Sequence, residues 1–485
     1  MTATRPELEF CGGNAGTQYL IFNMSMPSSF RDSETYFDTV IEFLCSYSWI
    51  YREANVACIP SINIMPLEFK KYFLEISNEK LNAFPYIHEN ISDYPSELCS
   101  FRQQLSILTP NLNSPKTFDV MRNNRNHKGL STKKTQEIKQ LAAHIHDHCA
   151  NTQVLVDLGA GLGYLSHALY GLKPDCLILG LEADMARVEQ ARQRCLRCLP
   201  PDAINSIRYL QKFVSFDSGS YIDEQTSELA RNNGSLDRKT ISIIGLHACG
   251  DLSINAMHLF LKMPRVQCLH IMPCCYHKLE VVNHGRDSDA KSFTNFPLSA
   301  ALGKSVKKSF KNPFLNRPFL RLACQRSTSN WWRDCTEGAH KEHGYRMYMR
   351  ALAEAILNST EFVKPRKSRF PVASYPIDFF EIKRRFQLFS KESGASVEWQ
   401  PSHENMFFEI STMYTDQEGS MLVEGLTCLQ AAMQKLCENV VLFDRLCFLK
   451  EAAENQKLTV QVRYETLFDE KISPRCQVLF AEKLF

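Results

Sequence analysis

The sequence predicts an α/β protein with a doubly wound, mostly parallel seven-stranded sheet, a helical N-terminal domain and a large helical insertion before the last two strands. Three observations predict it. Short apolar runs alternate with amphipathic helical patterns in the middle of the chain, which is typical of a parallel sheet with helices on both faces. Helical periodicity dominates the segments on either side of that middle part. Two further apolar runs close the chain, so the helical segment before them is interpreted as an insertion.

The boundaries follow from these changes in pattern. Residues 1–115 form the expected helical domain, and residues 116–284 hold the alternating pattern of the sheet core. Residues 285–455 are mostly helical in pattern and open with basic residues and prolines, so we expect an insertion that carries a substrate region. Residues 456–485 contain the last two strands of the same sheet.

The individual elements are read from apolar runs and their spacing. Helices are expected over 164–170 and 184–199, and before the first strand with Ser131 as N-cap. The polar segment from Asp217 to Lys239 is expected to be a mobile excursion. The expected strands are Gln153 to Leu158, Cys176 to Leu181, Ile207 to Val214, Thr240 to Leu246, Val266 to Met272, Leu458 to Tyr464 and Cys476 to Ala481.

Bulk composition narrows the class of protein. The 485 residues are 44% hydrophobic and 22% charged, which fits a globular protein with a sizeable core. The net charge of +3 is too small to indicate a nucleic-acid partner without local clusters. The N-terminus is acidic where a signal peptide needs an apolar run, and no run approaches the ~18 apolar residues of a membrane span. We therefore expect no membrane partner, a cytoplasmic or nuclear location, and reduced thiols for the 18 cysteines.

The strongest local signal is the segment Val154 to Gly163, an apolar strand that runs into glycines at 159, 161 and 163 and then into a helix. Such glycines allow positive φ and close approach to a ligand, and the helix offers unpaired N–H groups. A dinucleotide loop would place its third glycine at Tyr164. The alternating glycines after Asp157 suit a zwitterion, with the acid receiving an ammonium and the helix facing a carboxylate. The methionine part of S-adenosylmethionine presents both groups.

An acidic residue, Glu182, ends the second expected strand. An acid at that place can accept hydrogen bonds from the two hydroxyls of a ribose. We therefore predict S-adenosylmethionine as the cofactor, although a plain βα turn and a nicotinamide or flavin site stay open as alternatives. The predicted cofactor-binding residues on these two strands are Asp157, Gly159, Ala160, Gly161, Gly163 and Glu182.

Clusters of His, Cys and Asp follow the fourth and fifth expected strands, in Gly245 to Leu252 and Met272 to Lys278. Both lie past the carboxyl ends of adjacent strands, where a doubly wound sheet places its active site. Methyl transfer needs an aligned acceptor and, for a protonated acceptor, a group that removes a proton. Candidates for the base or its orienter are His247, Asp251 and His277, and His247 also counts as a cofactor contact. The residues expected to shape the pocket are Cys274, Cys275 and Tyr276.

The same residues raise a metal alternative. Cys249, Cys274, Cys275 and His277 carry suitable ligand atoms. The adjacent cysteine pair lacks the Cys-x-x-Cys spacing of common zinc sites, so we predict no metal here. A plainer alternative is a set of buried small residues and satisfied histidines.

Together these motifs resemble the methyltransferase-like protein 25 family, whose members are also described as ribosomal RNA adenine dimethylase domain-containing. The resemblance rests on the Asp-x-Gly-x-Gly-x-Gly-Tyr-Leu-Ser loop and on the Gly-Leu-His-Ala-Cys-Gly-Asp-Leu and Cys-Cys-Tyr-His-Lys runs. The Trm-thirteen type tRNA methyltransferases look like more distant relatives. The resemblance implies a class I, Rossmann-like methyltransferase fold and does not fix the acceptor.

A Lys-Lys motif before the first strand extends the resemblance. The family pattern Met-Ser-Pro-Lys-Lys-x-His-Glu is altered here at Leu130, Thr132 and Gln136, and Lys133, Lys134 and Glu137 carry over. The two lysines fall in the first turn of the expected helix, where the macrodipole disfavours cations by up to about 1 kcal/mol. We therefore assign Lys133 to the cofactor site, with two solvated lysines as the alternative.

Three basic clusters flank the predicted core and bear on the acceptor. If these clusters share a face with the mouth of the cofactor site, they would attract a polyanion such as RNA. The alternative interpretation is that the basic residues lie in solvated loops without a partner. We expect a macromolecular acceptor, either RNA or a translation-linked protein, and the competing interpretation is an inactive methyltransferase-fold scaffold. The clusters are Arg122, Arg125, Lys128, Lys133 and Lys134; Lys304, Lys307, Lys308, Lys311, Arg317, Arg321 and Arg326; and Lys364, Arg366, Lys367 and Arg369.

Overall fold

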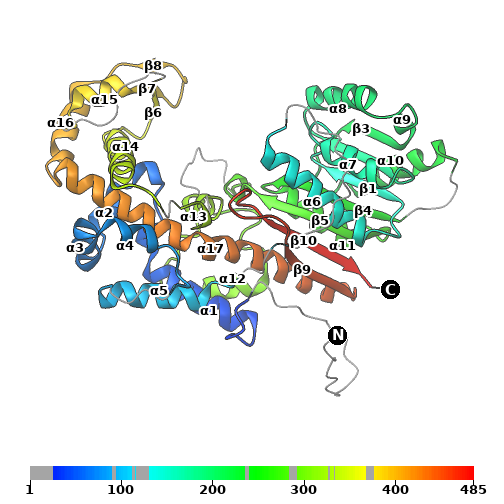
Figure 1. Cartoon of the computed structure of the whole chain (residues 1–485), viewed down its shortest axis with the longest axis horizontal. Helices are drawn as coiled ribbons and strands as arrows, with labels where there is room; N and C mark the ends of the chain where they lie inside the picture. Colours follow the sequence, from blue (N-terminus) through cyan, green and yellow to red (C-terminus); the bar gives the residue numbers. More distant parts are fainter. Residues whose placement is uncertain are drawn as a thin grey trace.

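The computed structural model describes residues 26–89, 94–111, 115, 130–234, 240–282, 292–325, 328–331, 334–366 and 376–484. Figure 1 shows an α/β body at one end of the molecule and a helical body at the other, with the long helix α17 (Asp416–Asn455) running between them. No helix of the described residues has the length and apolar character needed to cross a membrane.

The α/β body is built on a seven-stranded sheet with the order β3-β2-β1-β4-β5-β10-β9. The first five strands pair in parallel, and β10 is antiparallel to both of its neighbours. The predicted doubly wound, mostly parallel seven-stranded sheet is therefore confirmed. Its strands are β1 (Val154–Leu158), β2 (Leu177–Glu182), β3 (Ile207–Gln211), β4 (Ile241–Cys249), β5 (Val266–Cys274), β9 (Val460–Thr466) and β10 (Gln477–Lys483).

Apolar residues on both faces explain why these strands are central. Every residue of β1 is buried, as expected for a parallel strand covered on both sides. One face packs against α6, α7 and α8, and the other against α10 and α11. These helices are α6 (Thr132–His148), α7 (Tyr164–Leu172), α8 (Met185–Cys198), α10 (Gly219–Asn232) and α11 (Leu252–Lys262).

Of two local predictions, the helix cap at Ser131 is confirmed and the mobile segment after Asp217 is not. The Ser131 hydroxyl accepts a hydrogen bond from the Lys134 N–H and caps α6, as predicted. The prediction of a polar excursion after Asp217 is wrong over Gly219–Asn232, which form α10. Its Ile222, Thr226, Leu229 and Ala230 are buried, and this i, i+4, i+7, i+8 spacing is an amphipathic stripe that the high polarity of the segment concealed. Residues 235–239 lie outside the described part.

The helical body combines helices from both ends of the chain. The rings of Tyr36 and Phe37 on α1 pack against Phe443 on α17, and the Gln430 side chain on α17 donates to the Ile50 carbonyl. The first helices and the insertion therefore share one core. The helices are α1 (Ser33–Ser46), α2 (Ile59–Asn63), α3 (Leu67–Glu75), α4 (Asn78–Ala83), α5 (Ser96–Leu108), α12 (Ala300–Lys308), α13 (Arg317–Ala323), α14 (Glu337–Ala355), α15 (Phe379–Arg385), α16 (Pro401–Ser411) and α17.

A small antiparallel sheet adds to the helical body at the end far from the α/β body (Figure 1). It consists of β6 (Glu361–Pro365), β7 (Phe386–Ser390) and β8 (Ser396–Val397) in the order β6-β7-β8. The sequence predicts a mostly helical insertion and does not mark these strands.

Candidate active site

The loop after β1 lies where the strand order reverses between β1 and β4, the position at which open α/β sheets bind ligands. Gly159, Gly161 and Gly163 have φ values of +71°, +56° and +75°, in the left-handed region that favours glycine. A Cβ at Gly163 would lie 2.3 Å from the Tyr209 hydroxyl oxygen. Residues 159–162, Ala160 included, are exposed or half-buried, so the loop backbone is accessible to a ligand.

Asp157 is buried at the end of β1, directly before this loop. Its Oδ2 accepts a hydrogen bond of 2.8 Å from the Ser166 hydroxyl on α7. Burial raises the pKa of the Asp157 carboxyl to about 7; the Ser166 hydrogen bond opposes this shift, and the charge of Glu182 adds to it more weakly. A cation placed beside this carboxyl would restore its charged form.

Glu182, at the end of β2, points into the same loop. Its Oε2 accepts from the Gly161 N–H at 3.0 Å, and its Oε1 accepts from the Asp184 N–H at 3.2 Å. A carboxylate offers about four acceptor positions, so this side chain can hold the loop and still accept hydroxyl groups. Two acidic side chains therefore border the glycine loop, one from each strand.

A histidine–carboxylate pair lies at the end of β4. The Nε2 of His247 is 3.1 Å from Glu137 Oε2, and the Ser473 hydroxyl donates to Glu137 Oε1 at 2.6 Å. Lys133 contacts the same carboxylate, with its Nζ 3.7 Å from Oε1. The His247 side chain is 41% exposed and that of Glu137 only 1%. A buried carboxylate thus fixes an accessible imidazole.

Glu137 is the residue that sequence reasoning left without a role. Burial pushes its pKa upward, but hydrogen bonds from His247 and Ser473, together with the charges of His247 and Lys133, outweigh burial and lower it. The available signal was the spacing: Lys133 and Glu137 stand one helical turn apart on α6, so they meet on one face.

Asp251 is engaged by the loop that follows β5. Its Oδ2 accepts from the Glu280 N–H and its Oδ1 from the Asn295 side chain, each at 2.8 Å. These contacts make Asp251 an anchor of that loop.

Three thiols gather at the ends of β4 and β5. The Sγ atoms of Cys249 and Cys274 are 3.1 Å apart, and both lie within 4.8 Å of the Cys275 Sγ. The pKa of Cys249 is lowered to about 6, first by its hydrogen bond with Cys274, against burial, with Cys275, Lys278 and His247 adding to the effect. Cys275 and His247 both have positive φ, +50° and +69°, and such backbone conformations cluster at functional sites.

Tyr276 and His277 both contact residues of the helical insertion. Tyr276 is buried, and its hydroxyl donates to Glu438 Oε1 on α17 at 3.0 Å. The carbonyl of His277 accepts from the Arg317 guanidinium. Burial, followed by the charges of Arg321, Lys278 and Arg317, lowers the pKa of His277. The structure thus separates the predicted catalytic residues: His247 pairs with Glu137, Cys274 and Cys275 lie with Cys249, and His277 lies beside basic residues.

The predicted basic clusters do not share one location. Arg317 and Arg321 surround His277 at the sheet edge, whereas Lys308 on α12 pairs with Asp38 on α1. Lys364 of the third cluster lies over the rings of Phe362 and Phe389 in the small sheet. Arg122, Arg125, Lys128, Arg326, Lys367 and Arg369 lie outside the described residues.

Comparison with known proteins agrees with this geometry. A family described as a methyltransferase domain matches residues 133–282. The chain is 25% identical over 250 residues to the probable methyltransferase-like protein 25 of Mus musculus and 25% identical over 249 residues to that of Homo sapiens. Each match covers 51% of this chain and 38% of the relative, so the matched part spans well under half the length of these curated relatives.

Solved structures give weaker likenesses. The methyltransferase domain of bacterial CtHen1 is 19% identical, over 29% of this chain and 65% of that chain, with a TM-score of 0.21. The plantazolicin methyltransferase BpumL in complex with SAH is 12% identical, over 42% of this chain and 60% of that chain, with a TM-score of 0.20. The strand order and the glycine loop therefore carry the fold assignment. The chain is thus similar to the methyltransferase-like protein 25 relatives and carries a methyltransferase domain with the class I, Rossmann-like fold.

Proposed function

We propose that this protein transfers a methyl group from S-adenosylmethionine to a macromolecular acceptor, with RNA as the first candidate and a translation-linked protein as the second. The observation that carries the proposal is the open glycine loop between the carboxyls of Asp157 and Glu182. Asp157 suits the ammonium of the methionine part, and Glu182 suits the ribose hydroxyls. A Cβ at Gly161 would meet only the Gly159 carbonyl, at 3.9 Å, so the loop has room for a ligand.

The bound cofactor supplies an activated methyl group on its sulfonium, and the chain's own residues align and deprotonate the acceptor. With its Nε2–H donated to Glu137, His247 has Nδ1 as its basic nitrogen. An accessible imidazole with this support can take a proton from an acceptor O–H or N–H as the methyl group transfers. Ser473 and Lys133 hold Glu137, so they position the base indirectly.

The charges beside the thiol group favour an anionic acceptor. Arg317, Arg321 and Lys278 surround His277 at the end of β5, next to the edge that ends in Cys274. Clustered cations attract phosphate groups and steer polyanions toward a site. This is why RNA stands first among the acceptors.

The proposal is tested by S-adenosylmethionine calorimetry followed by transfer of labelled methyl groups into total RNA and total protein. Asp157→Ala should weaken cofactor binding by about 30-fold or more, since losing one partner of a buried charge pair costs roughly 2–5 kcal/mol. Label should appear with the wild-type protein and disappear with the variant. The matched control is Asp175→Ala, an exposed acid just before β2, which should behave as wild type.

A folded wild-type protein that does not bind S-adenosylmethionine would overturn the proposal and favour the inactive scaffold. Label in protein alone would keep methyl transfer and move the acceptor to the second candidate.

A further inference from the structure

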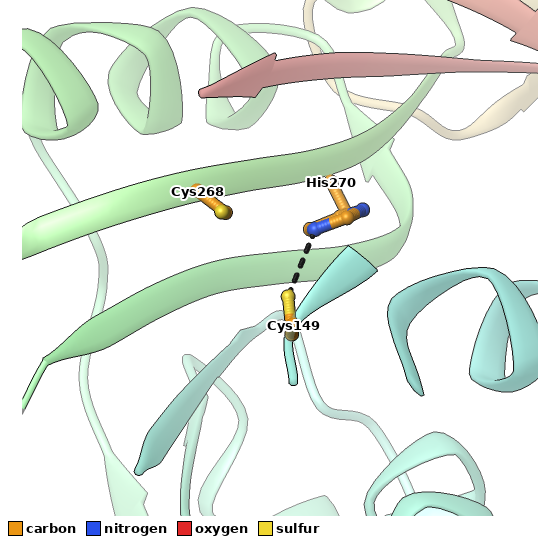
Figure 2. A group of neighbouring side chains, drawn as sticks. All are labelled: Cys149, Cys268 and His270. Carbon is orange, nitrogen blue, oxygen red and sulfur yellow. Dashed lines mark hydrogen bonds between the residues drawn. The ribbon is translucent and has the colours of Figure 1, made fainter. Parts of the chain in front are cut away.

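A second group of ligand-type side chains lies inside the α/β body, away from the glycine loop. Cys149 follows the last residue of α6, and Cys268 and His270 are two positions apart on β5, so they point to the same face of the strand. All three are buried. Figure 2 shows their side chains converging from β5 and from the end of α6.

The distances suit a shared ion. The Sγ of Cys149 is 3.1 Å from the Nε2 of His270, and the Sγ of Cys268 lies within 4.8 Å of both. Zinc bonds of about 2.3 Å to sulfur and about 2.0 Å to nitrogen, at a tetrahedral angle, place sulfur and nitrogen about 3.5 Å apart. The separation of Cys149 Sγ and His270 Nε2 is therefore within a few tenths of an ångström of that in a zinc site, and the Cys268 Sγ is close enough to join them. The Ser242 hydroxyl, with its Oγ 3.4 Å from the Cys149 Sγ, stands beside it.

An outer layer holds the imidazole in place. The Nδ1 of His270 is 3.2 Å from the Nδ1 of His144, and the Nε2 of His144 is 3.4 Å from Glu465 Oε2. Metal-bound histidines usually donate their second ring nitrogen to such a supporting group, which fixes the ring and its tautomer. Here the support extends from β5 through α6 to β9.

Hydrogen bonds alone do not explain well why two thiols and an imidazole are buried together here. Besides Ser242 and His144, the group shares its core with the apolar residues Leu141, Ile145, Ile244 and Met272. Thiols are weak donors and weak acceptors, so they do little to offset the burial of an imidazole. Two thiolates and an imidazole around a divalent cation satisfy one another fully.

We propose that Cys149, Cys268 and His270 bind one Zn²⁺, with the Ser242 hydroxyl or a water molecule as the fourth ligand. The ion fastens the C-terminal end of α6 to β5. The other end of α6 carries Lys133 and Glu137, which hold His247, so the ion stabilises the helix that positions the proposed base. This site is separate from cofactor binding and goes beyond the proposed methyl transfer.

Metal analysis of the full chain, purified without chelators and supplied with Zn²⁺, tests the proposal. We expect about one equivalent of zinc per chain in the wild type, and less than a tenth of that in Cys268→Ser and in His270→Gln. His144→Gln should weaken zinc binding by about 10–100-fold, as the loss of a supporting group does. Cys195→Ser is the matched control, because Cys195 is a buried thiol in the same core but outside the group, and it should keep the zinc.

Cobalt substitution gives a second measurement, in which absorption reports thiolate ligands directly. Co²⁺ in the wild type should give thiolate-to-cobalt absorption that falls to less than a tenth in Cys268→Ser. Cys249→Ser should leave it unchanged, because Cys249 belongs to the other thiol group. Wild-type protein that is folded and zinc-free after supplementation overturns the proposal, as does zinc lost from Cys249→Ser but kept in His270→Gln. S-adenosylmethionine calorimetry on the same wild-type samples separates this failure from a failure of the proposed function.

Discussion

Two histidine–carboxylate pairs are attached to the same helix, α6, and they differ in one property. Near its start, Glu137 holds His247, whose side chain is 41% exposed. Near its end, His144 faces Glu465, and both are buried. The open pair can exchange a proton with a ligand, whereas the closed pair can only support its neighbours. Access to solvent, more than residue type, therefore separates a candidate catalytic pair from a structural one.

The largest effect should come from substituting the histidine of each pair in turn and comparing the two variants. His247→Gln removes the proposed base and should lower kcat by roughly 10²–10⁴-fold, the usual contribution of a positioned acid or base, with little change in cofactor affinity. His144→Gln should leave kcat within a few-fold and lower the melting temperature by several degrees. Single-turnover methyl transfer and thermal unfolding measure both. Equal losses of kcat in the two variants would contradict the distinction.

A smaller effect should appear in the pH dependence of cofactor binding. The pKa of Asp157 is raised to about 7 in the free protein, and an ammonium partner favours the charged form. Affinity should therefore be full above pH 7 and fall by up to about tenfold per pH unit below it, until the pKa of the complex is reached. Calorimetry between pH 8 and 5.5 measures this slope. Asp157→Asn, which cannot titrate there, should bind weakly with a flat profile.

The comparison of an open site with a closed one also applies to two thiols, Cys249 and Cys149, with a smaller expected effect. Cys249 is half-buried, with its pKa lowered to about 6, and Cys149 is buried at the C-terminal end of α6. The thiolate is the reactive form and the pKa of both thiols is lowered, so access decides between them, and iodoacetamide should modify the half-buried Cys249 about tenfold faster than the buried Cys149 at pH 7. The rate at Cys249 should decline as the pH falls through 6. Peptide mass spectrometry at short times measures both rates, and faster modification of Cys149 would reverse the assignment of open and closed sites.

Much of the fold could be predicted from the sequence because periodicity is a local property. The run Val154–Leu158 and its successors along the sheet are buried on both faces, and that condition is visible as uninterrupted apolar residues. The helix over Gly219–Asn232 was missed because only one narrow stripe of it is buried. The glycine loop could be recognised for the same reason, because its three glycines with left-handed backbone conformation are close together in the chain.

Contacts between distant residues were out of reach of such reasoning. Cys149 and His270 are 121 positions apart, and Ser473 reaches Glu137 across 336. Periodicity identifies which face of an element is covered, but not which other element covers it. The Cys-x-x-Cys argument therefore covers only ligands that are close in the chain, because adjacent strands and helix ends can bring ligand-type side chains together without any short spacing.

The length of helix α17 determines how large an acceptor must be to contact both ends of the molecule. Its 40 residues make a rod of about 60 Å at 1.5 Å per residue. The rod begins in the helical body and leads directly into β9, which pairs with β10 beside β5. This helix therefore fixes the distance between the far end of the helical body and the sheet. A substrate that touches both ends at once must itself extend over several nanometres.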